Sequence, residues 1–242
     1  MRSTLLVRFA ASLIACLVVT AGMVAQDAPN TLTAKEKEGG WRLLFDGSST
    51  ANWRGYKKAD MSGLRWQVQD GAICLPKADG ADTRGNRDII STDTFGDFDL
   101  TWQWKVETGS NSGLKYFVTE TRDAAIGHEY QLIETTHADA ASTERRTASF
   151  YDVKAATGAE AKPAGQWNTS RVLVQGNHVE HWLNGRKVLE YELGSPETLA
   201  LVQDSKFKDT AGFGTKVKGH ILLQDHGDAV CYRSIKIRPG TT

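Results

Sequence analysis

The sequence has little cysteine or proline and no excess of either charge. Among its 242 residues are three Cys and five Pro, and 29 Lys and Arg balance 29 Asp and Glu. A protein that binds nucleic acid needs surplus Lys and Arg to neutralise phosphates, so the neutral balance argues against that class. The cysteines form no CxxC pair and no zinc pattern. No Pro- or Ser-rich linker and no repeat interrupts residues 41–239, which predicts a single domain.

The longest apolar run lies at the N-terminus. Arg2 and Arg8 come before or beside an uncharged stretch from Phe9 to about Val24, with small residues near Ala25. This order predicts a signal peptide over residues 1–25, because a run of about 17 residues is short for a membrane anchor. We therefore expect an exported protein, periplasmic or secreted, without a membrane span once the signal is removed. Its mature chain would carry 27 basic against 29 acidic residues.

Two points about the exported chain stay open at this stage. Cys16 closes a Leu-Ile-Ala-Cys sequence that resembles a bacterial lipobox, so a lipoprotein is the lesser alternative. Cys74 and Cys231 could pair in an oxidising compartment, but their spacing alone does not decide it. Residues 26–40 are polar and Ala-rich and predict a flexible lead-in to the domain.

The hydrophobic periodicity beyond residue 41 is that of β-strands. Two-residue alternation recurs in short runs, and Asp70-Gly71, Gly176-Asn177 and Asn184-Gly185 are hairpin turn sequences. One short segment, Pro196–Lys206, has a helical pattern. We therefore predict an all-β fold, an antiparallel sandwich or jelly roll. Its expected strands are Trp66–Val68, Ala72–Leu75, Phe98–Val106, Gly113–Thr119, Glu129–Ile133, Ser149–Val153, Ser170–Gln175, His178–Leu183, Arg186–Tyr191, His220–Gln224 and Ala229–Ile237.

Alternation also assigns side chains to faces. Lys115, with Phe117, lies on the opposite face from Leu114 and Tyr116, and Glu129 and Gln131 share a face of the next strand. At the end of the strand at residues 220–224, Gln224 and His226 are two residues apart and so share a face. Such a mixture of Gln, His and aromatic side chains with single charges favours a carbohydrate-sized cleft over a merely solvated face.

Ten segments, spread in order over residues 41–238, resemble one known family. They are Trp41–Gly47, Trp53–Gly55, Gly96–Leu100, Asn111–Val118, Gly127–Gln131, Ser149–Asp152, Gly165–Asn168, Gly176–Gly185, Gly219–Gly227 and Arg233–Ile237. Through them the chain resembles the 3-keto-disaccharide hydrolase family, long known as a domain of unknown function. The resemblance implies a concanavalin-like jelly roll, a bacterial source and activity on 3-keto-glycosides. It also implies a functional link to a sugar 3-dehydrogenase that would supply the substrate.

A C3 ketone acidifies the hydrogen at C2, so such a site needs a base, an enolate stabiliser and an acid. The predicted route is β-elimination of the C1 substituent followed by hydration. We expect either Glu129 or His226 to be the base and Lys115 to stabilise the enolate. The expected substrate-binding residues, which orient hydroxyls or stack on the sugar, are Gln131, Tyr151, His181, Gln224 and Trp104.

No metal site and no organic cofactor are predicted. Ca²⁺ stays open, because lectin-like jelly rolls often carry it. The alternative function is a non-catalytic carbohydrate-binding module, which the same fold and aromatic residues would serve. Convergence of Lys, Glu and His in one pocket would favour the enzyme.

Overall fold

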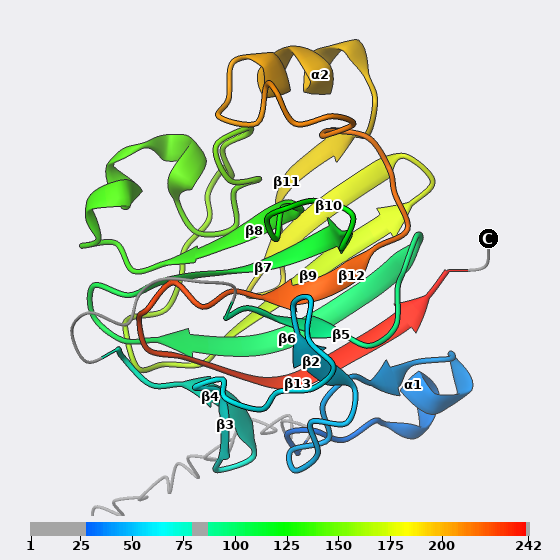
Figure 1. The fold of residues 1–242 in the computed structure, drawn as a ribbon, viewed down its shortest axis with the longest axis vertical. Coiled ribbons are helices and arrows are strands. Elements are labelled where there is room, and N and C mark those ends of the chain that lie inside the picture. The colour runs from blue at the N-terminus through cyan, green and yellow to red at the C-terminus, as the bar shows by residue number, and fades with distance from the viewer. Residues whose placement is uncertain (1–27, 79–86, 241–242) are drawn as a thin grey trace, which may run out of the picture.

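The computed structural model describes residues 28–78 and 87–240, and its regular secondary structure is mainly β-strand (Figure 1). The predicted signal peptide and Cys16 lie outside the described residues. In the part that is described, no helix is long and apolar enough to cross a membrane. The helical elements are α1 (Ala34–Glu38), α2 (Pro196–Gln203) and two 3₁₀ turns, η1 (Ala138–Ala141) and η2 (Thr143–Arg145).

Two antiparallel sheets form a sandwich. The eight-stranded sheet has the order β11-β10-β9-β6-β13-β4-β3, with β1 also paired to β13, and the five-stranded sheet has the order β2-β5-β12-β7-β8. The prediction of an antiparallel, jelly-roll sandwich is confirmed. The larger sheet contains β1 (Arg42–Leu43), β3 (Gln67–Gln69), β4 (Ala72–Leu75), β6 (Phe98–Val106), β9 (Asn168–Gln175), β10 (His178–Leu183), β11 (Arg186–Glu192) and β13 (Val230–Pro239). The smaller sheet contains β2 (Trp53–Gly55), β5 (Ile89–Ser91), β7 (Asn111–Val118), β8 (His128–Ile133) and β12 (His220–Leu223).

The three predicted hairpin turns connect neighbouring strands. Asp70-Gly71 joins β3 to β4, and Asn184-Gly185 joins β10 to β11. All four of these residues have positive φ, between 49° and 84°, as a type I′ turn requires. The third turn, Gly176-Asn177, joins β9 to β10. These turns order the larger sheet locally, hairpin by hairpin.

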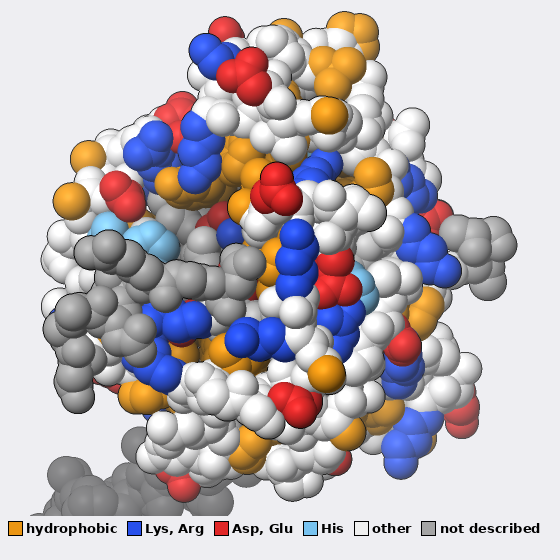
Figure 2. Space-filling view, in the orientation of Figure 1, with side chains coloured by type: hydrophobic (Ala, Val, Ile, Leu, Met, Phe, Trp, Pro, Cys, Tyr) orange, Lys and Arg blue, Asp and Glu red, His pale blue; other side chains and the backbone are white. Residues whose placement is uncertain are grey.

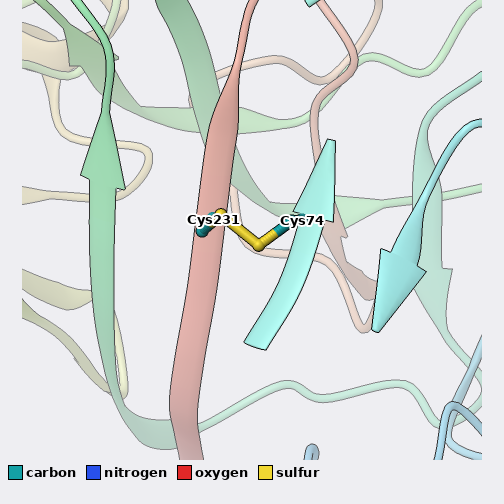
Figure 3. Close-up of a disulfide and its surroundings, with 2 residues drawn as sticks. All are labelled: Cys74 and Cys231. Carbon is teal, nitrogen blue, oxygen red and sulfur yellow. A yellow bond between two sulfur atoms is a disulfide. The ribbon is translucent and has the colours of Figure 1, made fainter. Parts of the chain in front are cut away.

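The core lies between the sheets and is rich in aromatic rings. A disulfide joins two strands of the larger sheet on the face away from the core: Cys74 on β4 and Cys231 on β13 are directly opposite in the ladder, with 4.1 Å between their Cα atoms (Figure 3). The bond joins positions 157 residues apart. The strand register thus answers the pairing question that the spacing left open. The largest fully buried aromatic side chains are Trp102, Trp104, Tyr56, Tyr116, Tyr130, Tyr232, Phe45, Phe98, Phe117 and Phe150.

One predicted strand is wrong. Residues 149–153 form a turn, because Ala148 and Asp152 both have left-handed backbone conformations, with φ of 69° and 63°. This turn lies along β8: Phe150 forms an isolated bridge with Tyr130, and the Tyr151 N–H donates to the Glu129 carbonyl at 3.0 Å. The residues of this run alternate in hydrophobicity as in a strand, yet the backbone changes direction at both ends of the run. That reversal places Tyr151 beside Glu129.

The N-terminal segment, predicted to be a flexible lead-in, contains the short helix α1. Thr33 and Glu36 form a reciprocal capping box that starts α1. Glu36 then binds Lys236 of β13, with Lys236 Nζ 2.8 Å from Glu36 Oε1. Asn30 accepts from the Ser234 N–H at 2.7 Å. From residue 28 onward this segment therefore packs against β13, an interior strand of the larger sheet.

A backbone irregularity in β7 changes one side-chain assignment. Phe117 has φ of 60°, and the pairing of β7 with β12 shifts register there. Phe117 consequently points into the core beside Tyr116, instead of sharing the face of Lys115 as strict alternation predicted. Lys115 keeps its outward position. The outer face of the five-stranded sheet therefore presents polar side chains in the middle of β7 and β8.

Candidate active site

A pocket of about 480 Å³ lies on the outer face of the five-stranded sheet. This volume lies within the range of small-molecule sites. Figure 2 shows this side of the molecule, with Lys and Arg side chains gathered around a hollow. The floor comes from β7, β8 and the end of β12, and the walls come from residues 124–127, the turn at 151 and residues 206–210, which follow α2. The lining polar residues are Asp88, Asn111, Lys115, Glu129, Gln131, Tyr151, Lys206, Thr210, Gln224 and His226.

Glu129 and Lys115 form the centre of the floor. They are paired directly across β8 and β7, and Lys115 Nζ lies 3.7 Å from Glu129 Oε2. Lys115 Nζ also donates to the Ala125 carbonyl at 3.2 Å. The Glu129 side chain is only 6% exposed. Burial raises its pKa, and the neighbouring Lys115 charge partly opposes that rise. Glu129 is thus a carboxyl group whose environment favours proton uptake, as a general base requires.

Two neighbours hold the Glu129 carboxyl group in place. A Cβ at Gly113 would lie 2.9 Å from Glu129 Cδ and even closer to Oε1, so only glycine leaves room for this carboxylate. With its amide nitrogen on the side of Glu129, Gln131 donates to Glu129 Oε1 and to the Ser112 carbonyl, both at 3.0 Å. The glycine in the Asn-Ser-Gly segment therefore serves a side chain on the next strand.

His226 and Asp88 lie on the other side of the pocket. The His226 side chain is 43% exposed at the rim, with Nδ1 3.9 Å from Asp228 Oδ2. Asp88 is half-buried; desolvation raises its pKa, and the Lys115 charge acts against that rise. The Asp225 N–H donates to Asp88 Oδ1 at 2.8 Å, which ties Asp88 to the chain just before His226. Two titratable groups, the half-buried Asp88 and the more exposed His226, therefore line the same pocket as Glu129.

Six of the eight predicted site residues line this single pocket: Lys115, Glu129, Gln131, Tyr151, Gln224 and His226. The other two do not. Trp104 is fully buried between the sheets, where its indole N–H donates to Ser170 Oγ at 2.8 Å. His181 is fully buried as well. Since neither side chain reaches the pocket, the prediction that they contact a sugar there is corrected.

His181 instead ends a buried chain of hydrogen bonds between the two sheets. Its Nδ1 donates to the Ala148 carbonyl at 2.8 Å, so its Nε2 accepts from the Tyr116 hydroxyl at 2.9 Å. Tyr116 in turn accepts from Tyr191 at 2.7 Å, and His128 Nδ1 donates to Tyr191 at 2.9 Å. His128 Nε2 accepts from the Gly214 N–H, which fixes its tautomer. Every member has a partner, which indicates a structural role.

Sequence reasoning missed several pocket residues. Asp88 precedes the short strand β5, which was not predicted, and Lys206 was placed at the end of a helix that in fact stops at Gln203. Phe207 and Thr210 belong to the irregular segment that follows. None of these positions has a periodic pattern or a motif. Only the folding of α2 and its following segment onto the sheet brings them to the pocket.

A second group of titratable side chains lies away from the pocket, on β10 and β11. The ligand atoms of His178, Glu180 and Glu190 lie close enough together to hold a metal ion. In the described part of the chain, this is the one group of His, Cys, Asp or Glu side chains with that geometry. Lys187 already bridges the two carboxylates, with Nζ 3.2 Å from Glu180 Oε1 and 2.5 Å from Glu190 Oε2. A lysine ammonium thus supplies the positive charge at this cluster.

Comparison with known proteins places the chain in a sugar-processing context. Residues 40–238 match the family model described as a 3-keto-alpha-glucoside-1,2-lyase-like domain. A protein of Bacteroides thetaiotaomicron named 3-keto-disaccharide hydrolase is 33% identical over 228 residues, covering 82% of this chain and 78% of that protein.

Two crystal structures of candidate glycosyl hydrolases from Parabacteroides distasonis ATCC 8503 are also similar. The first has a TM-score of 0.79 and 31% identity, over 88% of this chain and all of that one. The second has a TM-score of 0.65 and 25% identity, over 83% of this chain and 99% of that one.

Proposed function

Because the chain belongs to the 3-keto-alpha-glucoside-1,2-lyase-like family, it is a carbohydrate-active enzyme, and we propose that it cleaves the glycosidic bond of 3-keto-glycosides and 3-keto-disaccharides. The observation that carries this proposal is the buried Glu129 carboxyl group, held by Lys115 and Gln131 at the floor of a sugar-sized pocket. A carboxyl group whose pKa is raised by burial is a suitable base for a carbon acid.

The proposed reaction starts at C2 of the sugar. Glu129 removes the C2 proton, and the electrons of that C–H bond form the enolate of the C3 ketone. When the ketone re-forms, the C1–O bond breaks, a C1=C2 double bond forms and the aglycone leaves with a proton from an acid. Addition of water across C1=C2 then completes a net hydrolysis. The scheme needs no cofactor beyond the substrate and water, and no second carboxylate of the ordinary glycosidase kind.

We assign the acid to His226, which leaves Glu129 as the base. His226 lies at the exposed rim, where a departing aglycone and entering water have access. Glu129 lies in the interior, where it is screened from water and directed by its strand partners. The two candidates that the sequence left equivalent thus differ in burial, and burial favours Glu129 as the base that removes the proton from C2.

The remaining polar groups of the floor would bind hydroxyl groups. Gln131 and Gln224 flank Glu129, and Tyr151 forms part of the wall. The carbonyl oxygen of the Gln224 side-chain amide is buried without a hydrogen-bond partner. A sugar hydroxyl could donate to it, which would remove the cost of leaving a buried acceptor unpaired.

We also propose that the protein works outside the cytoplasm. The Cys74–Cys231 disulfide supports an oxidising compartment, since such bonds persist in periplasmic and secreted proteins. The predicted signal peptide agrees with this location. The substrate must come from an enzyme that oxidises a sugar at C3, so a sugar 3-dehydrogenase is the expected upstream activity.

The test is incubation with 3-keto-trehalose or a 3-keto-glucoside, with release of the sugar or aglycone followed over time. Glu129→Gln should lower the rate by about 10²–10⁴-fold, as removal of a general base does. His226→Ala should slow release less when the leaving group is a good one. Release that is unchanged in both variants would reject these roles. No release from any 3-keto substrate, with retained sugar binding, would favour a carbohydrate-binding module.

A further inference from the structure

Lys206 lies on the wall of the pocket. Unlike the residues of the floor, it belongs to a segment outside both sheets. α2 and the residues after it stand at the top of Figure 1, beyond the strands. The Lys206 N–H donates to Asp152 Oδ2 at 2.9 Å, and Arg145 Nε donates to Asp152 Oδ1 at 2.8 Å. The backbone of Lys206 is therefore attached to the same turn that carries Tyr151.

The Lys206 ammonium group lies against two aromatic rings and, among the described residues, forms no ion pair. Its Nζ lies 4.1 Å from the centre of the Tyr151 ring and 5.0 Å from that of Phe207. Among residues 28–78 and 87–240, no carboxylate pairs with it and no oxygen accepts a hydrogen bond from it. Lys115, in contrast, is committed to Glu129 and to the Ala125 carbonyl. Lys206 is thus the pocket lysine whose ammonium donors are available to a ligand.

Lys206 and Glu129 face the same space without touching. Tyr151 connects them, because its N–H donates to the Glu129 carbonyl and its ring lies under the Lys206 ammonium. Both side chains line the same pocket, and no ion pair joins them. Desolvation raises the pKa of Glu129 and lowers that of the more exposed Lys206, and each charge acts against the shift of the other.

This separation matches what the reaction requires. The base must approach the hydrogen on C2 while a cation approaches the oxygen on C3, the neighbouring carbon. Resting on the function proposed above, we propose that Lys206 is a further catalytic residue, whose ammonium group donates a hydrogen bond to the C3 oxygen and stabilises the enolate. In this proposal Lys115 keeps Glu129 in place, and the enolate-stabilising role that the sequence suggested for Lys115 passes to Lys206.

The step balances without any further reactant. The C2–H bond breaks, Glu129 takes the proton, and the electron pair moves through C2=C3 to the C3 oxygen, where Lys206 meets the developing charge. Lys206 forms no covalent bond. When the ketone re-forms, the electrons return and break the C1–O bond.

The experiment compares Lys206→Met, Lys206→Arg and Lys208→Met with the wild type on a 3-keto-glucoside. Lys208→Met is the matched control, because Lys208 is exposed on the same segment and does not line the pocket. Lys206→Met should lower kcat by about 10²–10³-fold, the usual effect of removing one oxyanion donor, with a smaller change in KM. Lys206→Arg should keep a substantial part of the rate, and Lys208→Met should equal the wild type.

A second readout isolates the enolate step. A 3-keto sugar that lacks a leaving group at C1 should exchange its C2 hydrogen in D₂O, and Lys206→Met should slow this exchange as strongly as it slows cleavage. Exchange and cleavage within threefold of the wild type would overturn the role of Lys206 and leave the proposed function standing. A sugar adduct trapped on Lys206 by cyanoborohydride would also overturn it, in favour of covalent chemistry. A wild-type enzyme inactive on every 3-keto substrate would instead refute the proposed function itself.

Discussion

Lys115 and Glu129 are direct partners across β7 and β8, with 3.7 Å between Lys115 Nζ and Glu129 Oε2. Both side chains are nearly buried, at 13% and 6% exposure. A carboxylate in such a place depends on its cation, because removing one member of a buried pair leaves the other uncompensated. The pair therefore controls the protonation of the group that we assign as the base.

Lys115→Met should raise the pKa of Glu129 further, because burial would then act without the opposing charge. A base must be ionised to act, so the acid limb of the kcat/KM profile should move to higher pH. The measurement is a pH–rate profile on a 3-keto-glucoside. Lys105→Met, on the other sheet, is the control and should keep the wild-type profile. An acid limb that does not move would show that Lys115 does not set the ionisation of the base.

Gly113→Ala should displace the Glu129 carboxyl group, because the added Cβ would lie 2.9 Å from Glu129 Cδ. We expect a loss of about 10²-fold in kcat, since misplacing a catalytic group by about 1 Å costs this much. Shortening the side chain should relieve the clash, so Glu129→Asp should cost less in the Gly113→Ala background than in the wild type. Strictly additive losses in this double-mutant cycle would contradict the close approach.

The buried histidines should make the fold sensitive to acid. Burial lowers the pKa of His128 to about 3 and that of His181 to about 4. The unfolded chain then binds more protons between these values and about 6.5, so stability is complete above about pH 6.5 and falls as the pH falls. Each histidine should remove about 2 kcal/mol between pH 7.5 and pH 5.

Urea unfolding at pH 7.5 and pH 5 measures this loss. His181→Gln should be less stable than the wild type at pH 7.5 but should lose less of its remaining stability on acidification. The variant comparison is needed because other groups titrate over the same range. An equal loss in both proteins would exclude His181 as a source of the acid sensitivity.

Loss of the disulfide should weaken the sandwich without affecting the pocket directly. Cys74 and Cys231 close a loop of 157 residues, and removing a disulfide costs about 2–5 kcal/mol. The variant with both residues replaced by Ala should unfold at lower urea concentration, and the wild type with dithiothreitol should behave alike. Below its unfolding transition the double variant should retain the wild-type KM. A fully reduced wild type of unchanged stability would contradict this contribution.

The β-sandwich itself was predictable from local pattern. Two-residue alternation and positive-φ turn sequences act over a few residues, so Asp70-Gly71 and Asn184-Gly185 could be read as hairpins in advance. The same rule placed Lys115, Glu129 and Gln131 on corresponding faces of neighbouring strands. It failed where the backbone leaves regular geometry, at Phe117 and over residues 149–153, because positive φ there interrupts the alternation.

The sequence by itself determined which side chains share a strand face, and thereby the floor of the pocket. Alternation also placed His181 with Val179 and Leu183, and Trp104 with Leu100 and Trp102, on faces that are otherwise apolar. Both were nevertheless assigned to the sugar by side-chain type, and both are sealed between the sheets. Only the tertiary structure decided that Lys206 and Asp88 reach the pocket, because their segments have no periodicity and are positioned by contacts with distant residues. Periodicity depends on the local backbone, whereas a pocket wall depends on how segments distant in the sequence pack.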